Sequence, residues 1–297
     1  MRMRSRWPLA VSRWQVGREQ SWQLVVGSWQ LGHAFVLLAV GLGLSGCGPE
    51  GPAFPRANTS PAGSPIVEWP KPTGEVQVDA TIRVLDHFDG KGQRFYGVDD
   101  LGTSSQDENQ DPMFRLSDGA VLENVIIGDP AADGVHCYGS CTLKNVWWER
   151  VGEDAATFRG QQPDDVMLVD KGGASGAKDK VFQNNGVGTM IVKNFYVENF
   201  GKLYRSCGNC SKQAARTIVL ENITALPGKK SSCLVGLNEN YGDKAIFKGV
   251  SHVYIANKPK FPVCQRFLGN ARGLEPSKTT TGPDQNCAYD DHNVIVE

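Results

Sequence analysis

The chain has no heptad pattern, no Gly-x-y period and no long block of one charge. Their absence excludes a coiled coil, a collagen-like rod and a polyelectrolyte tail. A second long apolar run is also missing, which excludes a protein that crosses a membrane several times. The 31 basic residues nearly balance the 32 acidic ones, so we expect no nucleic-acid partner. What remains, 297 residues with 40% apolar side chains and 34 Gly, fits one large globular domain or two small ones.

The first 46 residues differ from the rest of the chain. They contain five Arg and one acidic residue, and an apolar stretch at 34–44 has the length of a signal-peptide core. The string Leu-Ser-Gly-Cys at 44–47 resembles the lipobox of bacterial lipoproteins, in which the cysteine is acylated. We therefore expect a lipoprotein-type signal peptide over 1–46 and lipidation of Cys47. An ordinary signal peptide, with no role for Cys47, is the alternative.

The segment that follows is rich in Pro, Gly and Ser. Residues 47–73 are expected to form the lipidated cysteine and a flexible tether, and residues 74–297 the folded domain. The protein would then be exported to the outer membrane or cell surface as a bacterial lipoprotein, or otherwise be secreted. A lipid anchor would be its only membrane contact.

Beyond residue 73 the chain shows no convincing amphipathic helix, and short apolar runs recur instead. The runs are Ala120–Ile127, Cys141–Trp148, Met190–Val197, Thr217–Ile223 and Ala245–Val250. Each contains an Asn or Gly, and the offsets between these residues are 21, 49, 28 and 27. The interval of 49 accommodates two coils, with residues 166–169 or 180–183 in the missing one.

Such a period is typical of a parallel β-solenoid in which Asn or Gly occupies each corner. A β-sandwich would need hairpin turns, and Asn-Gly occurs only at 185–186.

Eight cysteines are present, and seven remain after Cys47. Export to an oxidising compartment favours disulfides. We expect the pairs Cys137–Cys141, Cys207–Cys210 and Cys264–Cys287, with Cys233 unpaired. The alternative for the first two Cys pairs is a four-thiolate zinc site.

Ionisable residues gather at the coil spacing. Asp133 lies 20 and 21 residues before Glu153 and Asp154, so the three carboxylates should stack on neighbouring coils about 4.8 Å apart. Carboxylates this close repel one another unless a hard cation lies between them, which indicates calcium. Lys180 and then Lys202 and Arg205 follow on the next coils. An acidic calcium pocket beside a basic strip suits a polyanionic substrate.

Several long strings carry a resemblance to a known family. Residues 133–156, 179–186, 193–210 and 237–243, together with the tail from Cys264 to Cys287, closely resemble pectate lyases of polysaccharide lyase family 3. The resemblance covers 74–297. It implies an all-β fold, a single-stranded right-handed parallel β-helix, and a secreted enzyme. It also implies calcium-dependent cleavage of polygalacturonate (pectin) by β-elimination to 4,5-unsaturated oligogalacturonides.

The resemblance also assigns residues by position. Asp133, Glu153 and Asp154 are implied as calcium ligands, with Glu108 as an acidic residue near the metal. The implied catalytic and substrate-binding residues are Lys180, Lys202 and Arg205.

Residue chemistry favours Lys180 over Arg205 as the base that removes the C5 proton, because an ammonium among cations loses its proton more readily than a guanidinium. Arg205 would then clamp a uronate carboxylate. Arg205 as the base is the alternative, since other pectate lyases are thought to use arginine.

Two other functions fit the same residues. A non-catalytic calcium-binding β-helix could act as an adhesin for acidic polysaccharide, and a lyase could act on another uronan such as alginate. The lysines and Arg205 argue against an adhesin, since binding alone requires no base. We expect a monomer.

Aromatic residues and one histidine allow structural interpretations. One of Trp147 and Trp148 should pack inside, leaving the other free to stack on a sugar. Tyr204 is a candidate for sugar stacking or for corner packing. His136 is expected to be a packed strand residue and not a metal ligand.

Overall fold

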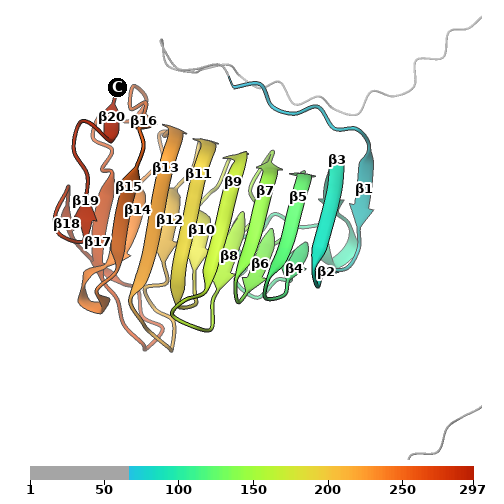
Figure 1. Ribbon diagram of the computed structural model, residues 1–297, viewed down its shortest axis with the longest axis horizontal. Coiled ribbons are helices and arrows are strands. Elements are labelled where there is room, and N and C mark those ends of the chain that lie inside the picture. The colour runs from blue at the N-terminus through green and yellow to red at the C-terminus, as the bar shows by residue number, and fades with distance from the viewer. Residues whose placement is uncertain (1–66) are drawn as a thin grey trace, which may run out of the picture. The chain divides into compact units, whose positions relative to one another are not determined.

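The strands of the chain recur once per turn and stack into two sheets (Figure 1). The computed structural model describes residues 67–297. The first sheet contains β1 (Glu75–Val78), β3 (His87–Gly97), β5 (Ala120–Ile127), β7 (Cys141–Trp148), β9 (Val166–Ser175), β11 (Gly188–Glu198), β13 (Arg216–Leu226), β15 (Lys244–Lys248), β16 (Ser251–Val253), β19 (Cys287–Ala288) and β20 (Val294–Val296). The second contains β2 (Ile82–Val84), β4 (Phe114–Leu116), β6 (Val135–Tyr138), β8 (Ala156–Arg159), β10 (Lys180–Asn184), β12 (Lys202–Ser206), β14 (Cys233–Asn238), β17 (Cys264–Leu268) and β18 (Ser277–Thr281).

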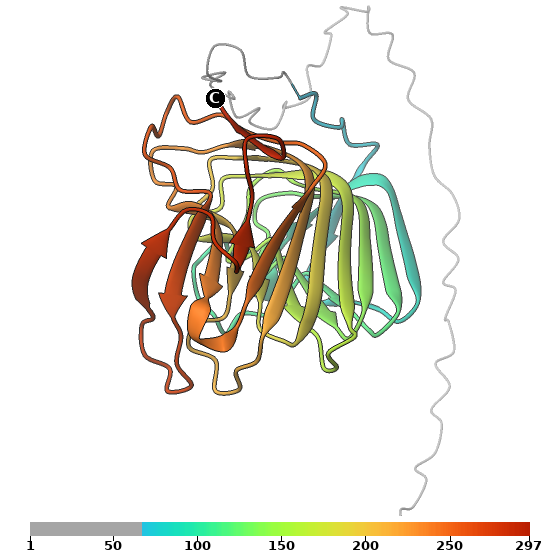
Figure 2. The same ribbon diagram turned by 60° about the vertical axis from the view of Figure 1, so that its left-hand side comes forward.

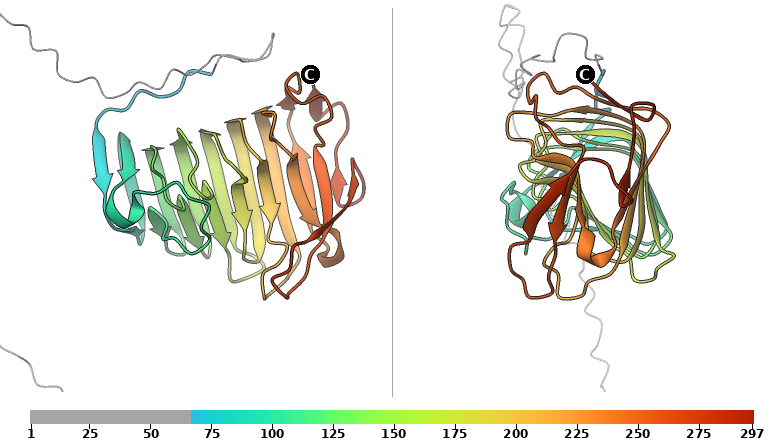
Figure 3. Two further views of the ribbon diagram at one scale, coloured as in Figure 1. Left: turned by 180° about the vertical axis from the view of Figure 1, so that it is seen from behind. Right: turned by 90° about the vertical axis from the view of Figure 1, so that its left-hand side faces the viewer.

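Consecutive coils pair in parallel, as in β5–β7 and β10–β12, while β17 and β18 pair antiparallel at the C-terminal end (Figure 2). The fold is therefore the expected all-β parallel β-helix. Two 3₁₀ turns, Asp99–Leu101 and Glu239–Tyr241, are the helical elements that the structure assigns within 67–297. The view along the axis shows the coils in register behind one another (Figure 3).

The corners are built as the sequence predicts. Asn124, Asn145, Asn194 and Asn222 each have φ of 54°, a left-handed conformation that Asn tolerates better than branched residues. The side-chain amide of Asn145 donates to Oδ1 of Asn124 at 3.0 Å, and that of Asn222 donates to Oδ1 of Asn194 at 3.1 Å. The corner asparagines thus also bond coil to coil.

The missing coil in the sequence spacing is supplied by β9. Its corner residue is Lys171, with φ of 64°, so residues 166–169 belong to the first sheet. Residues 180–183 lie in the second sheet instead, as part of β10. The sequence repeat was obscured because the corner residue of this coil is a lysine.

The core lies between the sheets. Trp148 is fully buried against Phe182 and Phe195, with ring centroids 6.2 and 6.3 Å away. Trp147 faces outward, and its ring lies 5.1 Å from that of Trp69. Since Trp69 already packs on this face, the folded body extends to residues before Gly74, where the sequence predicts the boundary.

All three predicted disulfides are present, namely Cys137–Cys141, Cys207–Cys210 and Cys264–Cys287. Cys233 is buried and unpaired, as expected. The zinc interpretation is wrong because its four cysteines are oxidised. Cys264–Cys287 connects β17 of one sheet to β19 of the other and closes the C-terminal end of the coil.

The expected signal peptide (1–46), Cys47 and residues 48–66 of the tether lie outside the described residues. Within residues 67–297, none of the helical segments has the length and apolarity needed to cross a membrane.

Candidate active site

Strand register brings the predicted ionisable residues into one column. Val135 of β6 pairs with Ala156 of β8, and Ala156 pairs with Phe182 of β10. Two residues before these positions lie Asp133, Asp154 and Lys180, and Lys180 pairs directly with Lys202. Four consecutive coils therefore contribute one charged residue each at the beginning of their strands in the second sheet.

The turns that precede β6 and β8 approach each other unusually closely. Gly134 has φ of 52°, and a Cβ there would lie 2.2 Å from the carbonyl oxygen of Ala155. Gly152 in the next turn is similar, since its Cβ would lie 2.1 Å from the carbonyl oxygen of Ala132. Any other residue would force the turns apart, so these glycines set the approach of the acidic residues.

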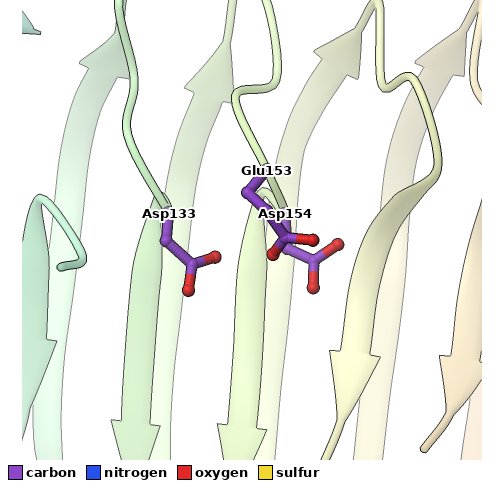
Figure 4. A group of neighbouring side chains, drawn as sticks. All are labelled: Asp133, Glu153 and Asp154. Atoms are coloured by element: carbon purple, nitrogen blue, oxygen red, sulfur yellow. The ribbon is translucent and has the colours of Figure 1, made fainter. Parts of the chain in front are cut away.

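Asp133, Glu153 and Asp154 form what we call the acid triad (Figure 4). Their carboxylate oxygens lie within 4.8 Å of one another. The residues are only 2, 3 and 1% exposed. Oδ1 of Asp133 and Oδ1 of Asp154 are buried and have no hydrogen-bond partner among the described residues. Buried acceptors of this kind are costly unless a ligand satisfies them.

Burial raises the pKa of every member of the triad. The pKa of Asp133 rises from 3.8 to about 7, that of Glu153 rises, and that of Asp154 rises well above its usual range. Repulsion among the three acids adds to the effect of burial on Glu153 and Asp154. The ionised triad therefore needs a cation, and an all-oxygen donor set suits a hard divalent ion such as calcium.

Lys180 adjoins the triad. Its Nζ lies 3.1 Å from Oε1 of Glu153, 3.1 Å from Oδ2 of Asp179, 3.4 Å from Oε1 of Glu108 and 3.5 Å from Oδ1 of Asp154. Burial alone would lower the pKa of Lys180, but the charges of Asp154 and Glu153 outweigh it and raise that pKa. Glu108 has a side chain 69% exposed and reaches the site through Lys180, outside the triad.

Asp179 links the two lysines. Its carboxylate contacts both Lys180 and Lys202, the latter through a very short ion pair. Burial opposes ionisation of Asp179, yet the charges of Lys180 and Lys202 together lower its pKa. The sequence pattern does not predict this role of Asp179, and its position directly before Lys180 is the one signal that points to it.

Arg205 lies one coil beyond Lys180, with a contrasting environment. It is 6% exposed, and its guanidinium donates to the carbonyl oxygen of Ser206 at 2.5 Å and to Oδ1 of Asn238 at 2.9 Å. Its Cζ lies 4.0 Å from the ring centroid of Phe267. It forms no ion pair with a carboxylate of residues 67–297, and burial lowers its pKa to about 10.

A buried network holds Asn238 against Arg205. The amide of the Asn238 side chain donates to the carbonyl oxygen of Cys207 at 3.0 Å, and its backbone N–H donates to Oδ2 of Asp243 at 2.8 Å. Asp243 also accepts from the backbone N–H of Arg216 at 3.0 Å. No chemical signal in the sequence predicts this support, although residues 237–243 lie in one of the strings that carry the resemblance.

The structure decides between the structural and functional interpretations of Tyr204 and His136. Tyr204 is completely buried, so it packs in the core and is not a sugar platform. His136 is buried in β6, and its Nε2 lies 2.6 Å from Oδ2 of Asp133. Burial, followed by the charge of Arg159, lowers the pKa of His136 to about 3, so the ring is neutral.

Comparison of the sequence with known proteins identifies its family. A family model described as pectate lyase matches residues 67–273. The chain belongs to the pectate lyase family. Pectate lyase E of Emericella nidulans is 42% identical over 223 residues, which cover 74% of this chain and 83% of that protein. Probable pectate lyase E of Aspergillus clavatus is 41% identical over 244 residues, 81% of this chain and 90% of that protein.

Solved pectate lyases have the same fold. The catalytic domain of pectate lyase PelI from Erwinia chrysanthemi superposes with a TM-score of 0.63 at 33% identity, covering 75% of this chain and all of that domain. PelI in complex with tetragalacturonic acid gives a TM-score of 0.61 at 31% identity, over 74% of this chain and 70% of PelI.

Proposed function

We propose that this protein is a calcium-dependent pectate lyase that cleaves polygalacturonate by β-elimination and releases 4,5-unsaturated oligogalacturonides. The observation that carries the proposal is the acid triad, in which Oδ1 of Asp133 and Oδ1 of Asp154 lack a hydrogen bond among the described residues, beside Lys180, Lys202 and Arg205 in a member of the pectate lyase family. A buried cation-binding pocket next to a basic strip matches a polymer whose every unit bears a carboxylate.

Asp133, Glu153 and Asp154 would hold the calcium ion, and Glu108 is the nearest further acid that could join them. When bound, calcium supplies Lewis-acid stabilisation of negative charge on a uronate carboxylate. It would also offset the repulsion within the triad. Lys180 and Lys202, both held by Asp179, would then orient a neighbouring carboxylate of the polymer.

We assign the base to Arg205, in place of the Lys180 favoured by residue chemistry alone. The ammonium of Lys180 lies within 3.5 Å of four carboxylates, which hold its proton, whereas Arg205 faces carbonyl and amide oxygens and an aromatic ring. Neutral Arg205 would accept the C5 proton of galacturonate. The C5–H electrons would form the C4–C5 double bond as the C4–oxygen bond breaks, and the leaving oxygen would take a proton from solvent. This chemistry is favoured at alkaline pH.

The full-length protein should therefore be incubated with polygalacturonate at alkaline pH in calcium or in EDTA. We expect a calcium-dependent rise in the ultraviolet absorbance of the unsaturated uronide. Glycoside hydrolysis would release new ends without that absorbance. If the protein binds polygalacturonate but releases no product, it is an adhesin. If it cleaves only another uronan, such as alginate, the proposed substrate is wrong.

Substitutions at the two candidate bases separate them. Arg205→Ala should abolish turnover at every pH, while Lys180→Ala should leave a weaker activity that still rises toward alkaline pH. If the alkaline rise is lost in Lys180→Ala but kept in Arg205→Ala, the base is Lys180 and the assignment to Arg205 is wrong. Calcium-dependent binding of polygalacturonate is the control for both variants.

We further propose that the protein acts outside the cytoplasm as a monomer, attached through a lipid on Cys47. The basic segment, the apolar stretch at 34–44 and the string at 44–47 support export and acylation. Mass spectrometry of the mature protein should find acylated Cys47 at its N-terminus, and Cys47→Ser should release the enzyme into solution. A mature N-terminus elsewhere, without lipid, would refute the anchor.

A further inference from the structure

A second basic cluster lies on the outward face of the second sheet. It consists of Arg115 on β4, Tyr138 on β6 and Arg159 on β8. Strand register pairs Tyr138 with Arg159 directly. The Cζ of Arg115 lies 4.2 Å from the ring centroid of Tyr138, and the Cζ of Arg159 lies 5.8 Å from it. Two guanidinium groups therefore adjoin the same tyrosine ring. We call these three residues the arginine–tyrosine cluster.

Neither guanidinium forms an ion pair with a carboxylate among the described residues. Some other arginines there do, for example Arg94 with Glu149 at 2.8 Å and Arg150 with Asp129 at 3.1 Å. Within residues 67–297, Arg115 and Arg159 pair with no carboxylate.

Arg159 is also incompletely hydrogen-bonded. Its Nε is buried without an acceptor in the described part of the chain, and its terminal nitrogen meets only Nε2 of the neutral His136, at 3.5 Å. A buried donor without an acceptor and two adjacent cations are both unfavourable, and one bound anion would relieve both.

We propose that the arginine–tyrosine cluster is an additional subsite that binds a uronate carboxylate of the polygalacturonate chain. The inference rests on the proposed function and extends it along the polymer. The fork of a guanidinium matches a carboxylate with two parallel hydrogen bonds, and the Tyr138 ring holds the two guanidinium groups close enough to bind one carboxylate together.

The position of the cluster fits a polymer already held at the acid triad. Asp133 immediately precedes β6, and Glu153 and Asp154 immediately precede β8, so the strands that begin at the triad carry Tyr138 and Arg159 near their ends. Arg115 extends the cluster one coil further toward the N-terminus. The side chains connect the two groups: the terminal nitrogen of Arg159 lies 3.5 Å from Nε2 of His136, which lies 2.6 Å from Oδ2 of Asp133, so one polymer chain can contact both the triad and the cluster.

The double variant R115Q/R159Q tests the subsite in the full-length protein. Lys144→Gln is the matched control, because it removes one exposed cation from β7 in the other sheet. We expect the KM for polygalacturonate to rise about tenfold or more in the double variant, a larger change than any fall in kcat, since two charge-assisted contacts are lost away from the reacting carbon. The control should match the wild type.

Binding of tetragalacturonate in calcium, measured with Arg205→Ala added so that turnover is prevented, gives a second readout. It should weaken in R115Q/R159Q, and Arg159→Lys should recover part of it by restoring the charge without the fork. Circular dichroism reports folding. If the double variant misfolds, the single change Arg115→Gln at an exposed residue replaces it.

The outcomes separate the subsite from the proposed function. A wild type that cleaves polygalacturonate, with unchanged KM and unchanged binding in the double variant, would refute the subsite and leave the function intact. A wild type that does not cleave but binds tetragalacturonate through Arg115 and Arg159 would refute the function and retain the subsite. Absence of both cleavage and binding would refute both.

Discussion

Asp133→Asn should have opposite effects on the metal-free fold and on the loaded enzyme. The asparagine is nearly isosteric, so it removes one negative charge from the acid triad without opening a cavity. In EDTA at pH 8 the ionised Asp133 is a buried like charge beside Glu153 and Asp154. We therefore expect the variant to be more stable than the wild type without metal, and to lose calcium-dependent activity.

The magnitude follows from the pKa of Asp133. Its rise from 3.8 to about 7 corresponds to about 4 kcal/mol of unfavourable free energy for the ionised folded state. Between these two pKa values the folded protein retains a proton that the unfolded chain has released, so stability falls as pH rises. The amide can still form a hydrogen bond with His136, but a weaker one than the carboxylate. A net stabilisation of about 2–4 kcal/mol at pH 8 is the expectation.

Urea unfolding followed by circular dichroism, in EDTA at pH 5 and pH 8, measures the difference. The advantage of the variant should be less than half of its full value at pH 5, because the wild type loses stability steadily between the unfolded and folded pKa values of Asp133, and it should be full at pH 8. Added calcium should stabilise the wild type more than the variant. A variant that is less stable than the wild type at pH 8 in EDTA, or an advantage independent of pH, would show that burial does not penalise the ionised Asp133 as we infer.

Three further predictions concern the same site. Asn238→Ala removes an acceptor of Arg205 and should lower kcat by about 10²-fold with little change in calcium binding. The control is Asn240→Ala, which removes a nearby amide that contacts Gly269 and should leave kcat unchanged. Equal losses of kcat in both variants would refute the positioning role of Asn238. The pH profile of kcat should rise toward an apparent pKa of about 10, the value that burial gives Arg205, and a plateau already reached at neutral pH would refute Arg205 as the base. Calcium binding near pH 7 should release protons as Asp133 ionises, which calorimetry in two buffers of different ionisation enthalpy detects; no buffer dependence would contradict the raised pKa.

The fold could be predicted because its repeat is written in local residue preferences. The corners at Asn124, Asn145, Asn194 and Asn222 require a positive φ that few residues tolerate, and their spacing gives the coil length. The corner at Lys171 could not be predicted, because lysine has no preference for a positive φ. Trp69 was placed in a tether for a similar reason, since its contact with Trp147 joins positions far apart in the sequence.

The acid triad could also be predicted from the sequence. In coils of constant length, residues 20 or 21 positions apart lie next to each other on neighbouring coils. Asp133 and Asp154 follow this rule directly, and the pairing of Lys180 with Lys202 continues it. The arginine–tyrosine cluster obeys the same register. It has no sequence signal because two arginines and a tyrosine are common on exposed faces. What sets them apart is that both guanidinium groups adjoin one ring and that Nε of Arg159 is buried without an acceptor among the described residues.

The identity of the base is different in kind, since residue type points in the wrong direction. In water a lysine loses its proton more readily than an arginine. In the fold the order of proton affinity is set by neighbours: carboxylates surround Lys180, while Arg205 lies between Asn238 and Phe267. These neighbours come from β14 and β17, coils later in the chain, at positions whose spacing has no chemical signature. A site whose ligands recur once per coil can be predicted from their spacing in the sequence. A pKa that depends on side chains contributed by later coils can be inferred only from the structure.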